Sequence, residues 1–324
     1  MQFSFELALA AFFGGALGAM IGALQAFALC GFAIVVGESY RILTHPWATL
    51  FGIDVTNDIG FGVLGPHIAF AGGAAAVAFV ARDPSYSTDF SYHPAKEITK
   101  PLIGHPSAVL LGGIFGLLGY ILYLGMLALP VPTDPIAAVV VLSALIHRGL
   151  FGYAILGYRN RSLRTLILSP GRAAELWLPY QSSWLRVVGI GSVMGCIGGI
   201  LAFVTGSAFL AFGISAASLY ILCISDVPLP VTHHLTLPGS TIVVAVIGDI
   251  SQTVSAELLI VGLILATIFG SLGGICGEIA QRIAYAHAET HLDPPAVSIV
   301  VTIVVIGLLA SAGIIPDSAW ISLP

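Results

Sequence analysis

Two stretches of this chain are versions of one another. The first reads LGPHIAFAGGAAAVAFVAR (residues 64–82), and the second reads THHLTLPGSTIVVAVIGD (residues 232–249). His67 with Gly72-Gly73 in the first corresponds to His234 with Gly239-Ser240 in the second. Both apolar parts are short for a full membrane crossing, and Gly or Pro interrupts both at corresponding places. Paired short, interrupted segments are typical of a transport site between two membrane repeats.

Further residues repeat in the same order on either side of these stretches. The separation between partners drifts only from 177 residues (Gly14 to Gly191) to 158 residues (Gly112 to Gly270). We therefore predict an internal duplication. The matching sets are Gly14, Gly18 and Gly22 with Gly191, Gly195 and Gly199; Gly112, Gly116 and Gly119 with Gly270, Gly274 and Gly277; and Asp134-Pro135 with Asp293-Pro294.

The composition is that of an integral membrane protein. Hydrophobic residues make up 57% of the chain and charged residues only 8%, whereas a soluble domain has about a quarter charged residues because it must cover a large wet surface. The net charge of -5 is spread over short loops, and no block of like charge indicates a nucleic-acid partner. The four cysteines all lie inside apolar runs, which predicts buried thiols and no disulfide framework.

Long apolar runs predict about ten transmembrane helices. Residues 4–44 are long enough for two spans with a tight turn near Gln25. The polar loops then divide the chain into a first repeat (1–158), a basic cytoplasmic connector (159–184) and a second repeat (185–324). The other predicted spans are residues 64–80, 107–129, 135–157, 185–204, 207–225, 235–249, 257–282 and 295–314.

Five spans per repeat is an odd number, so the two repeats enter the membrane from opposite sides and are inverted copies. The predicted fold class is an all-α, multi-pass protein of the cell membrane with two inverted five-span repeats. Lys and Arg gather in cytoplasmic loops, which places residues 82–106 and 148–186 inside and the loop at 45–63 outside. Arg41 is the exception.

The repeated glycines and aspartates have structural explanations. Gly rows at four-residue spacing allow two helix backbones to approach closely in lipid. Each Asp-Pro pair is typical of a helix start, because Asp accepts hydrogen bonds from free backbone N–H groups and Pro needs no donor there.

His67 and His234, with Gly72, Gly73, Gly239 and Ser240, are the first candidate site. Each His stands at the amino end of an interrupted helix, where partial positive charge suits an anion or a polar solute. The alternative is that both histidines cap helices at the water interface.

Glu38 and Glu278 are candidates because an ionisable side chain in an apolar span is costly and often functional. Glu38, if it faces a cavity, is a candidate for proton coupling. Arg282 stands four residues after Glu278 and Arg41 three after Glu38, so local ion pairs give the alternative explanation.

His287, Glu289 and His291 form a weak candidate for a metal site, since alternate spacing on an extended loop can gather ligands. A solvated loop that ends in the Asp293 cap is the favoured interpretation. No motif indicates a nucleotide, a dinucleotide or any other cofactor.

The segments FGVLGPHIAFAGG (61–73) and HLDPPA (291–296) resemble a family of uncharacterised prokaryotic polytopic membrane proteins that share a G-P-H-x-A-F-A-G-G string. The resemblance implies the membrane class and no settled activity.

From these features we expect a gradient-driven secondary transporter of a small ion or polar solute, and not an enzyme. A passive channel and a non-catalytic membrane subunit of a larger complex are the alternatives. The expected partners are the lipid bilayer, the solute and, in a homo-oligomer, further copies of the chain.

Overall fold

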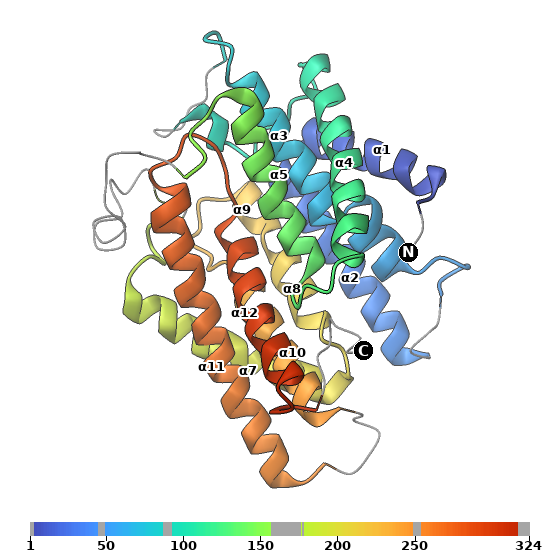
Figure 1. The fold of residues 1–324 in the computed structure, drawn as a ribbon, viewed down its shortest axis with the longest axis vertical. Helices are drawn as coiled ribbons and strands as arrows, with labels where there is room; N and C mark the ends of the chain where they lie inside the picture. The colour runs from blue at the N-terminus through green and yellow to red at the C-terminus, as the bar shows by residue number, and fades with distance from the viewer. Residues whose placement is uncertain are drawn as a thin grey trace.

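The computed structural model describes residues 3–44, 49–86, 93–156, 176, 178–248 and 254–316. The regular elements of these residues are all helices (Figure 1). Most of the predicted connector at 159–184 lies outside the described residues. Helices α1, α3, α4 and α5 of the first half occupy the upper part of Figure 1, and α7, α10, α11 and α12 of the second half occupy the lower part.

In the described residues, five main helical segments follow one another in each half. In the first half they are α1 (Phe5–Ile21), α2 (Ala23–Leu43), η1 (Val55–Val63) with η2 (Pro66–Phe70) and α3 (Ala71–Val80), α4 (Pro106–Leu127), and α5 (Pro135–Phe151), with the short η3 (Pro94–Lys96) before α4. In the second half they are α7 (Trp184–Thr205), α8 (Leu210–Ser218) with α9 (Tyr220–Ile224), α10 (His233–Ile247), α11 (Ala256–Ala280) with η5 (Gln281–Tyr285), and α12 (Pro294–Ser311).

Six helical stretches of the described residues are long and apolar enough to cross a membrane. Four others are equally apolar but only 10–17 residues long. About 20 consecutive apolar residues in a helix are enough to cross the hydrocarbon core of a bilayer, so these helices are typical of a membrane protein. The six are Ala23–Leu43, Val55–Val80, Pro106–Leu127, Trp184–Thr205, Ala256–Tyr285 and Pro294–Ser311.

The helix starts at the repeated Asp-Pro pairs are confirmed. The Asp134 carboxylate accepts a hydrogen bond from the Ala137 N–H at 2.9 Å, and Asp293 accepts one from the Ala296 N–H, also at 2.9 Å. The turn between the first two helices falls at Gly22, not near Gln25. Gly22 has φ +102°, a conformation that favours glycine.

The same helix packing recurs in both halves. A side chain at Gly15 would lie 2.7 Å from Cα of Gly116, and one at Gly195 would lie 2.7 Å from Cα of Gly270. These contacts join α1 to α4 and α7 to α11, with the helix backbones touching. The third segment of each half packs on the same pair, since Gly72 lies against Gly15 and Gly239 lies against Gly195.

These contacts correct the predicted register of the glycine rows. The equivalent pairs are Gly15 with Gly195, and Gly116 with Gly270. The predicted match is therefore wrong by three residues in the first helix and by four in the fourth helix. Both helices carry glycines at several spacings, so aligning glycines by sequence alone can be wrong by one helical turn. The backbone contacts identify the equivalent glycines directly.

The predicted span 207–225 corresponds to the apolar helical stretch Leu210–Ile224, in which the buried Leu219 separates α8 from α9. Two other predictions are wrong. The predicted outer loop at 45–63 contains η1, which extends the third segment. Arg148, predicted at the start of a cytoplasmic loop, is fully buried in α5. It donates hydrogen bonds of 2.8 Å to the carbonyl oxygens of Ala284 and Thr290, and so ties α5 to the segment before α12.

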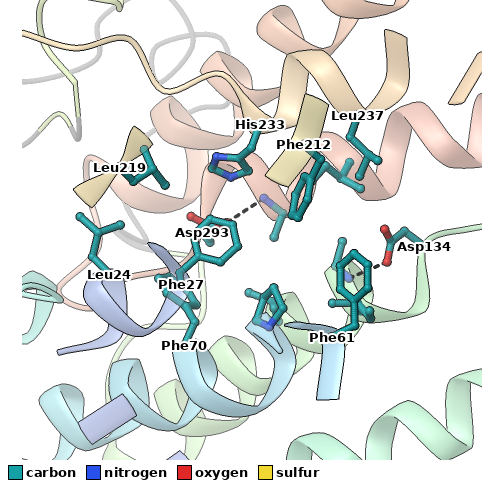
Figure 2. Close-up of a pocket in the computed structure, with 16 residues that line it drawn as sticks. Leu24, Phe27, Phe61, Phe70, Asp134, Phe212, Leu219, His233, Leu237 and Asp293 are labelled. Carbon is teal, nitrogen blue, oxygen red and sulfur yellow. Dashed lines mark hydrogen bonds between the residues drawn. The ribbon is translucent and has the colours of Figure 1, made fainter. Parts of the chain in front are cut away.

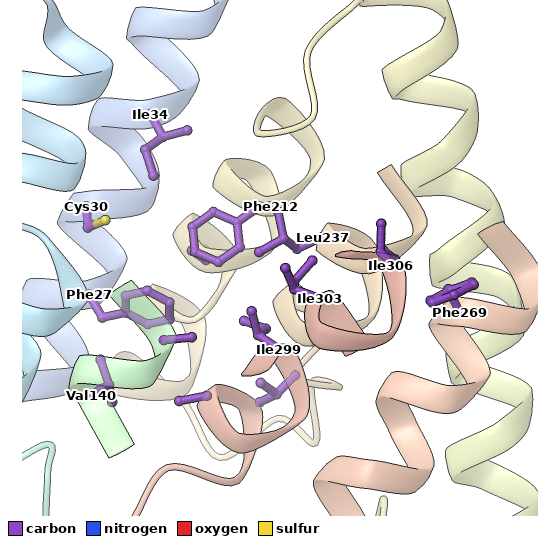
Figure 3. Packing of buried hydrophobic residues seen from close by; sticks show 14 of the residues in the cluster. Phe27, Cys30, Ile34, Val140, Phe212, Leu237, Phe269, Ile299, Ile303 and Ile306 are labelled. Atoms are coloured by element: carbon purple, nitrogen blue, oxygen red, sulfur yellow. The ribbon is translucent and has the colours of Figure 1, made fainter. Parts of the chain in front are cut away.

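The two halves meet through α2 with α8 and through α5 with α12. Gly31 of α2 lies against Ala216 and Ala217, while Gly213 of α8 lies against Ile34 and Val35. Residue numbers rise along α2 as they fall along α8, so the two helices run in opposite directions. Phe27, Phe212, Val140 and Ile299 lie in the apolar core between these helices (Figure 3).

We expect Gly119→Ala to destabilise the protein and Gly125→Ala, in the same helix, not to. A Cβ at Gly119 would meet the carbonyl oxygen of His67, whereas nothing lies within 4 Å of a Cβ at Gly125. Overpacking costs about 1–3 kcal/mol, while Gly→Ala in an open helix position gains up to about 1 kcal/mol. Thermal unfolding in detergent measures the difference, and equal melting temperatures would contradict the packing.

Candidate functional site

A small cavity of about 40 Å³ lies between the two halves of the chain (Figure 2). Its lining is contributed by both halves at equivalent positions. Asp134 and Asp293 both line it, each as the residue that caps its helix. The equivalent lining pairs are Pro66 with His233, Phe70 with Leu237, Asp134 with Asp293, Ala137 with Ala296, and Val140 with Ile299. We call this space the central cavity.

Aromatic rings form much of the wall of the central cavity. The His233 ring lies 4.9 Å from the Phe27 ring and 5.9 Å from the Phe212 ring, measured between centroids. Phe61 and Phe70 complete the aromatic wall. His233 is only 3% exposed, and its Nδ1 has no hydrogen-bond partner. Figure 2 shows this ring beside that of Phe27.

A larger cavity of about 340 Å³ lies beside His67. The His67 ring is 2% exposed, its Nδ1 has no partner, and its centroid lies 4.9 Å from that of Tyr123. Asn57 and Asp58, which are exposed, stand at the mouth of this His67 cavity. The volume falls in the range of small-molecule sites.

His234 lines a third cavity, of about 30 Å³, in the second half. Gly277 holds the place that Tyr123 holds beside His67, since a Cβ at Gly277 would lie 3.2 Å from Nε2 of His234. Glu278 and Gln281 also line this His234 cavity. Glu278 accepts hydrogen bonds from Gln281 at 2.7 Å and from Arg282 at 2.6 Å, so the space is filled by a polar network.

The three cavities share their walls. Phe61 lines both the central cavity and the His67 cavity, and Pro66, which lines the central cavity, is the neighbour of His67. On the other side, the consecutive residues His233 and His234 line the central cavity and the His234 cavity. Each repeated segment that carries a His therefore separates one outer cavity from the central one.

The predicted histidines lie at cavities, and their predicted neighbours do not. Neither His67 nor His234 caps a helix at the water interface, because both are buried and no side-chain cap bond is made there. Gly72 and Gly239 pack against α1 and α7. At the next position, Gly73 lies against the Gly18 carbonyl, while Ser240 donates a hydrogen bond of 3.0 Å to the Gly198 carbonyl.

The third segments do not break at the predicted corresponding places, since α3 runs as a regular helix through Gly72 and Gly73 and α10 is one continuous helix. They depart from ideal helix by different means. The chain is not helical at Gly62, where φ is -82° and ψ is -111°, and Pro66–Phe70 forms a π-helical turn before α3. In the second half, Pro238 lies inside α10 and so removes one helix hydrogen bond. Local π-helical turns often lie at functional sites.

Glu38 is buried but lines none of the three cavities. Its carboxylate accepts hydrogen bonds from Arg41 at 2.9 Å, Thr56 at 2.8 Å and Ser207 at 2.6 Å. Arg41 also pairs with Asp54. Burial works to raise the pKa of Asp54, yet its hydrogen bonds with Asn57 and Arg41 outweigh burial and lower that pKa. Glu38 thus joins α2 to η1 and to the start of α8. The predicted role in proton coupling required Glu38 to face a cavity, and it lines none of these three.

The segment that precedes α12 is not a solvated loop. His291 is 1% exposed, His287 is buried, and of the three candidate ligands only Glu289 is exposed. Among the described residues no three His, Cys, Asp or Glu side chains gather in an arrangement that could hold a metal ion. The segment is buried because Arg148 and Lys96 pack on it, with Lys96 Nζ 4.8 Å from the Tyr285 ring centroid.

Sequence reasoning missed Tyr123, Phe61 and His233 as lining residues. Phe61 lies in the predicted outer loop, and Tyr123 has no repeated partner because Gly277 stands at its equivalent position. His233 was visible as the neighbour of His234, and its partner position Pro66 directly precedes His67.

We expect a cysteine beside His67 to react with a water-soluble thiol reagent faster than one beside His234. Tyr123→Cys lines the cavity of about 340 Å³ and Leu178→Cys lines the cavity of about 30 Å³. The four native cysteines are first replaced by alanine, and open membrane fragments give the reagent access to both faces. Mass spectrometry measures the rates, and faster labelling of Leu178→Cys would contradict the difference in volume.

Glu38→Gln should lower the stability of the protein by about 1–3 kcal/mol, since hydrogen bonds to a charged group contribute about 1.5–3 kcal/mol each. Ser207→Ala, which removes one partner of the same carboxylate, should have a smaller effect in the same direction. Asp226→Asn, at an exposed position, is the control. Thermal unfolding in detergent checks this, and an unchanged Glu38→Gln melting temperature would show that the junction is not structural.

No curated protein and no solved structure matches this chain. One family model matches, and it does so over residues 1–172 and again over residues 164–324. The two matched ranges coincide with the two halves that share their helix packing and their repeated His segments. The whole chain is covered, so the protein belongs to the family described as "Family of unknown function (DUF7973)".

Proposed function

We propose that this protein is a gradient-driven transporter of a small ion or polar solute, spanning the cell membrane about ten times in two inverted five-span repeats. The six long helices and the four shorter apolar ones supply the ten spans. The shorter helices α5 and α10 are more than half buried among other helices, where they need not match the full bilayer thickness.

The opposite directions of α2 and α8 support the inverted relation. Thr133, just before α5, donates a hydrogen bond to the carbonyl of Val300 within α12, so the start of α5 lies along α12 and not beside its start. Two helices related by an axis in the membrane plane must run in opposite directions. The predicted inverted arrangement of the repeats is consistent with both contacts.

The central cavity is the observation that carries the proposal. It lies where the two halves meet, and equivalent residues of both halves line it. In transporters built from inverted repeats, the substrate site lies at this interface, beside interrupted helices. The His67 and His234 cavities then provide the two approaches to the site, one from each side.

The unequal outer cavities favour a transporter over a passive channel. The His67 cavity has a volume of about 340 Å³, and the His234 cavity has a volume of about 30 Å³. Unequal space on the two sides of a site is what alternating access produces, and exchange of the two arrangements would carry the solute across. A channel instead needs both approaches open at once, and a non-catalytic subunit needs neither.

The test is uptake into proteoliposomes before and after the central cavity is blocked. Val140→Cys, on a background without the four native cysteines, places a thiol in the cavity wall. Leu142→Cys, on the same helix but exposed on the outer surface, is the matched control. Methylammonium, formate and urea serve separately as cationic, anionic and neutral probes, each with an imposed gradient.

We expect the Val140→Cys protein to transport one probe until methyl methanethiosulfonate modifies it, and to recover when a reductant removes the adduct. The control should be unaffected by the reagent. Accumulation above the external concentration would distinguish a transporter from a channel, which only equilibrates its solute. No uptake of any probe by the unmodified protein would reject transport and favour the subunit alternative.

A further inference from the structure

We infer that the transported solute is a small monovalent cation of about the size of ammonium. The inference rests on the proposed transport function and names the substrate class of the central cavity. It follows from the charges along the three cavities, from the rings around the central one and from its size.

The charged groups that line the three cavities are all acidic in the described part of the chain. Asp58 lies at the mouth of the His67 cavity, Asp134 and Asp293 line the central cavity, and Glu278 lines the His234 cavity. No described Lys or Arg lines any of the three, although Arg282 neutralises Glu278 through its ion pair. A path lined by one sign of charge concentrates solutes of the opposite sign.

The helix starts at the central cavity do not reverse this charge. The amino end of a helix carries about half a positive charge, and α5 and α12 both begin at the cavity. Each of these ends also carries one aspartate, so about half a negative charge remains at each helix start. An anion in the cavity would lie beside both carboxylates, whereas a cation would be attracted by both.

The remaining lining suits a cation as well. Phe27, Phe61 and Phe212 present aromatic rings, and a cation over such a ring is attracted by its negative face. The Nδ1 atom of His233 has no partner in a residue that is 3% exposed. When neutral, a ring nitrogen without hydrogen accepts a hydrogen bond from an N–H donor, which a small protonated amine supplies.

The size of the central cavity limits the solute. About 40 Å³ exceeds the space that one water molecule needs and is far below that of a drug-sized ligand. Ammonium and methylammonium fit this space with little rearrangement. Larger organic cations need a wider site.

The experiment is uptake of methylammonium, formate and urea into proteoliposomes by the unmodified protein and by Asp134→Asn and Asp293→Asn. Asn caps a helix about as well as Asp, so each variant removes a charge and keeps the helix start. Asp226→Asn, exposed and away from the cavities, is the control. Thermal unfolding confirms that all four proteins are folded.

We expect uptake of methylammonium alone, inhibited by ammonium, with at least a tenfold loss in both cavity variants and none in the control. Uptake of formate or urea instead would overturn the cation inference and leave the transport function intact. Methylammonium uptake that both cavity variants retain would also overturn it. If the unmodified protein moves none of the probes, both the inference and the transport function fail.

Discussion

The structure depends on the close approach of the fourth helix of each half to the backbone of the His segment. Polar groups freed by a helix break survive at membrane depth only where protein or water covers them. Here Gly119 lies on the carbonyl of His67, and Gly273 lies on the carbonyl of His234. Any side chain at these glycines would push the fourth helix away from the break. The glycine rows are therefore a condition for the His segments, and not merely a means of packing helices.

The two repeats share their helix contacts and helix caps, but their cavities differ. The glycine contacts and the aspartate caps recur in both halves, whereas Tyr123 and Gly277 occupy one position with opposite sizes. The half with the larger residue nevertheless has the larger cavity. Gln281 and Leu178 line the space beside His234, whereas the described lining beside His67 comes from α1, η1, η2 and α4. The difference in volume between the His67 and His234 cavities thus comes from residues outside the shared glycine contacts.

Much of the fold could be predicted from the sequence because the decisive signals are local. The His67 and His234 register was read correctly, since a His followed five residues later by Gly is a specific pattern in apolar sequence. The glycine rows were read one turn out of register, because many spacings of glycine satisfy the same helix face. The central cavity was not predicted, since Phe27, Phe61 and Phe212 come from three segments whose meeting depends on tertiary packing.

Charge was the least predictable feature, for a physical reason. Glu38 was read as a candidate for proton coupling and Arg148 as the start of a cytoplasmic loop, yet each is buried and held by partners from distant segments. The acidic residues that line the central cavity were instead identified only as helix caps. A carboxylate that caps a helix uses one face for the backbone N–H and leaves other lone pairs available. Capping and solute binding at Asp134 and Asp293 are therefore compatible, and the repeated Asp-Pro pair can set the start of each helix and the charge of the cavity together.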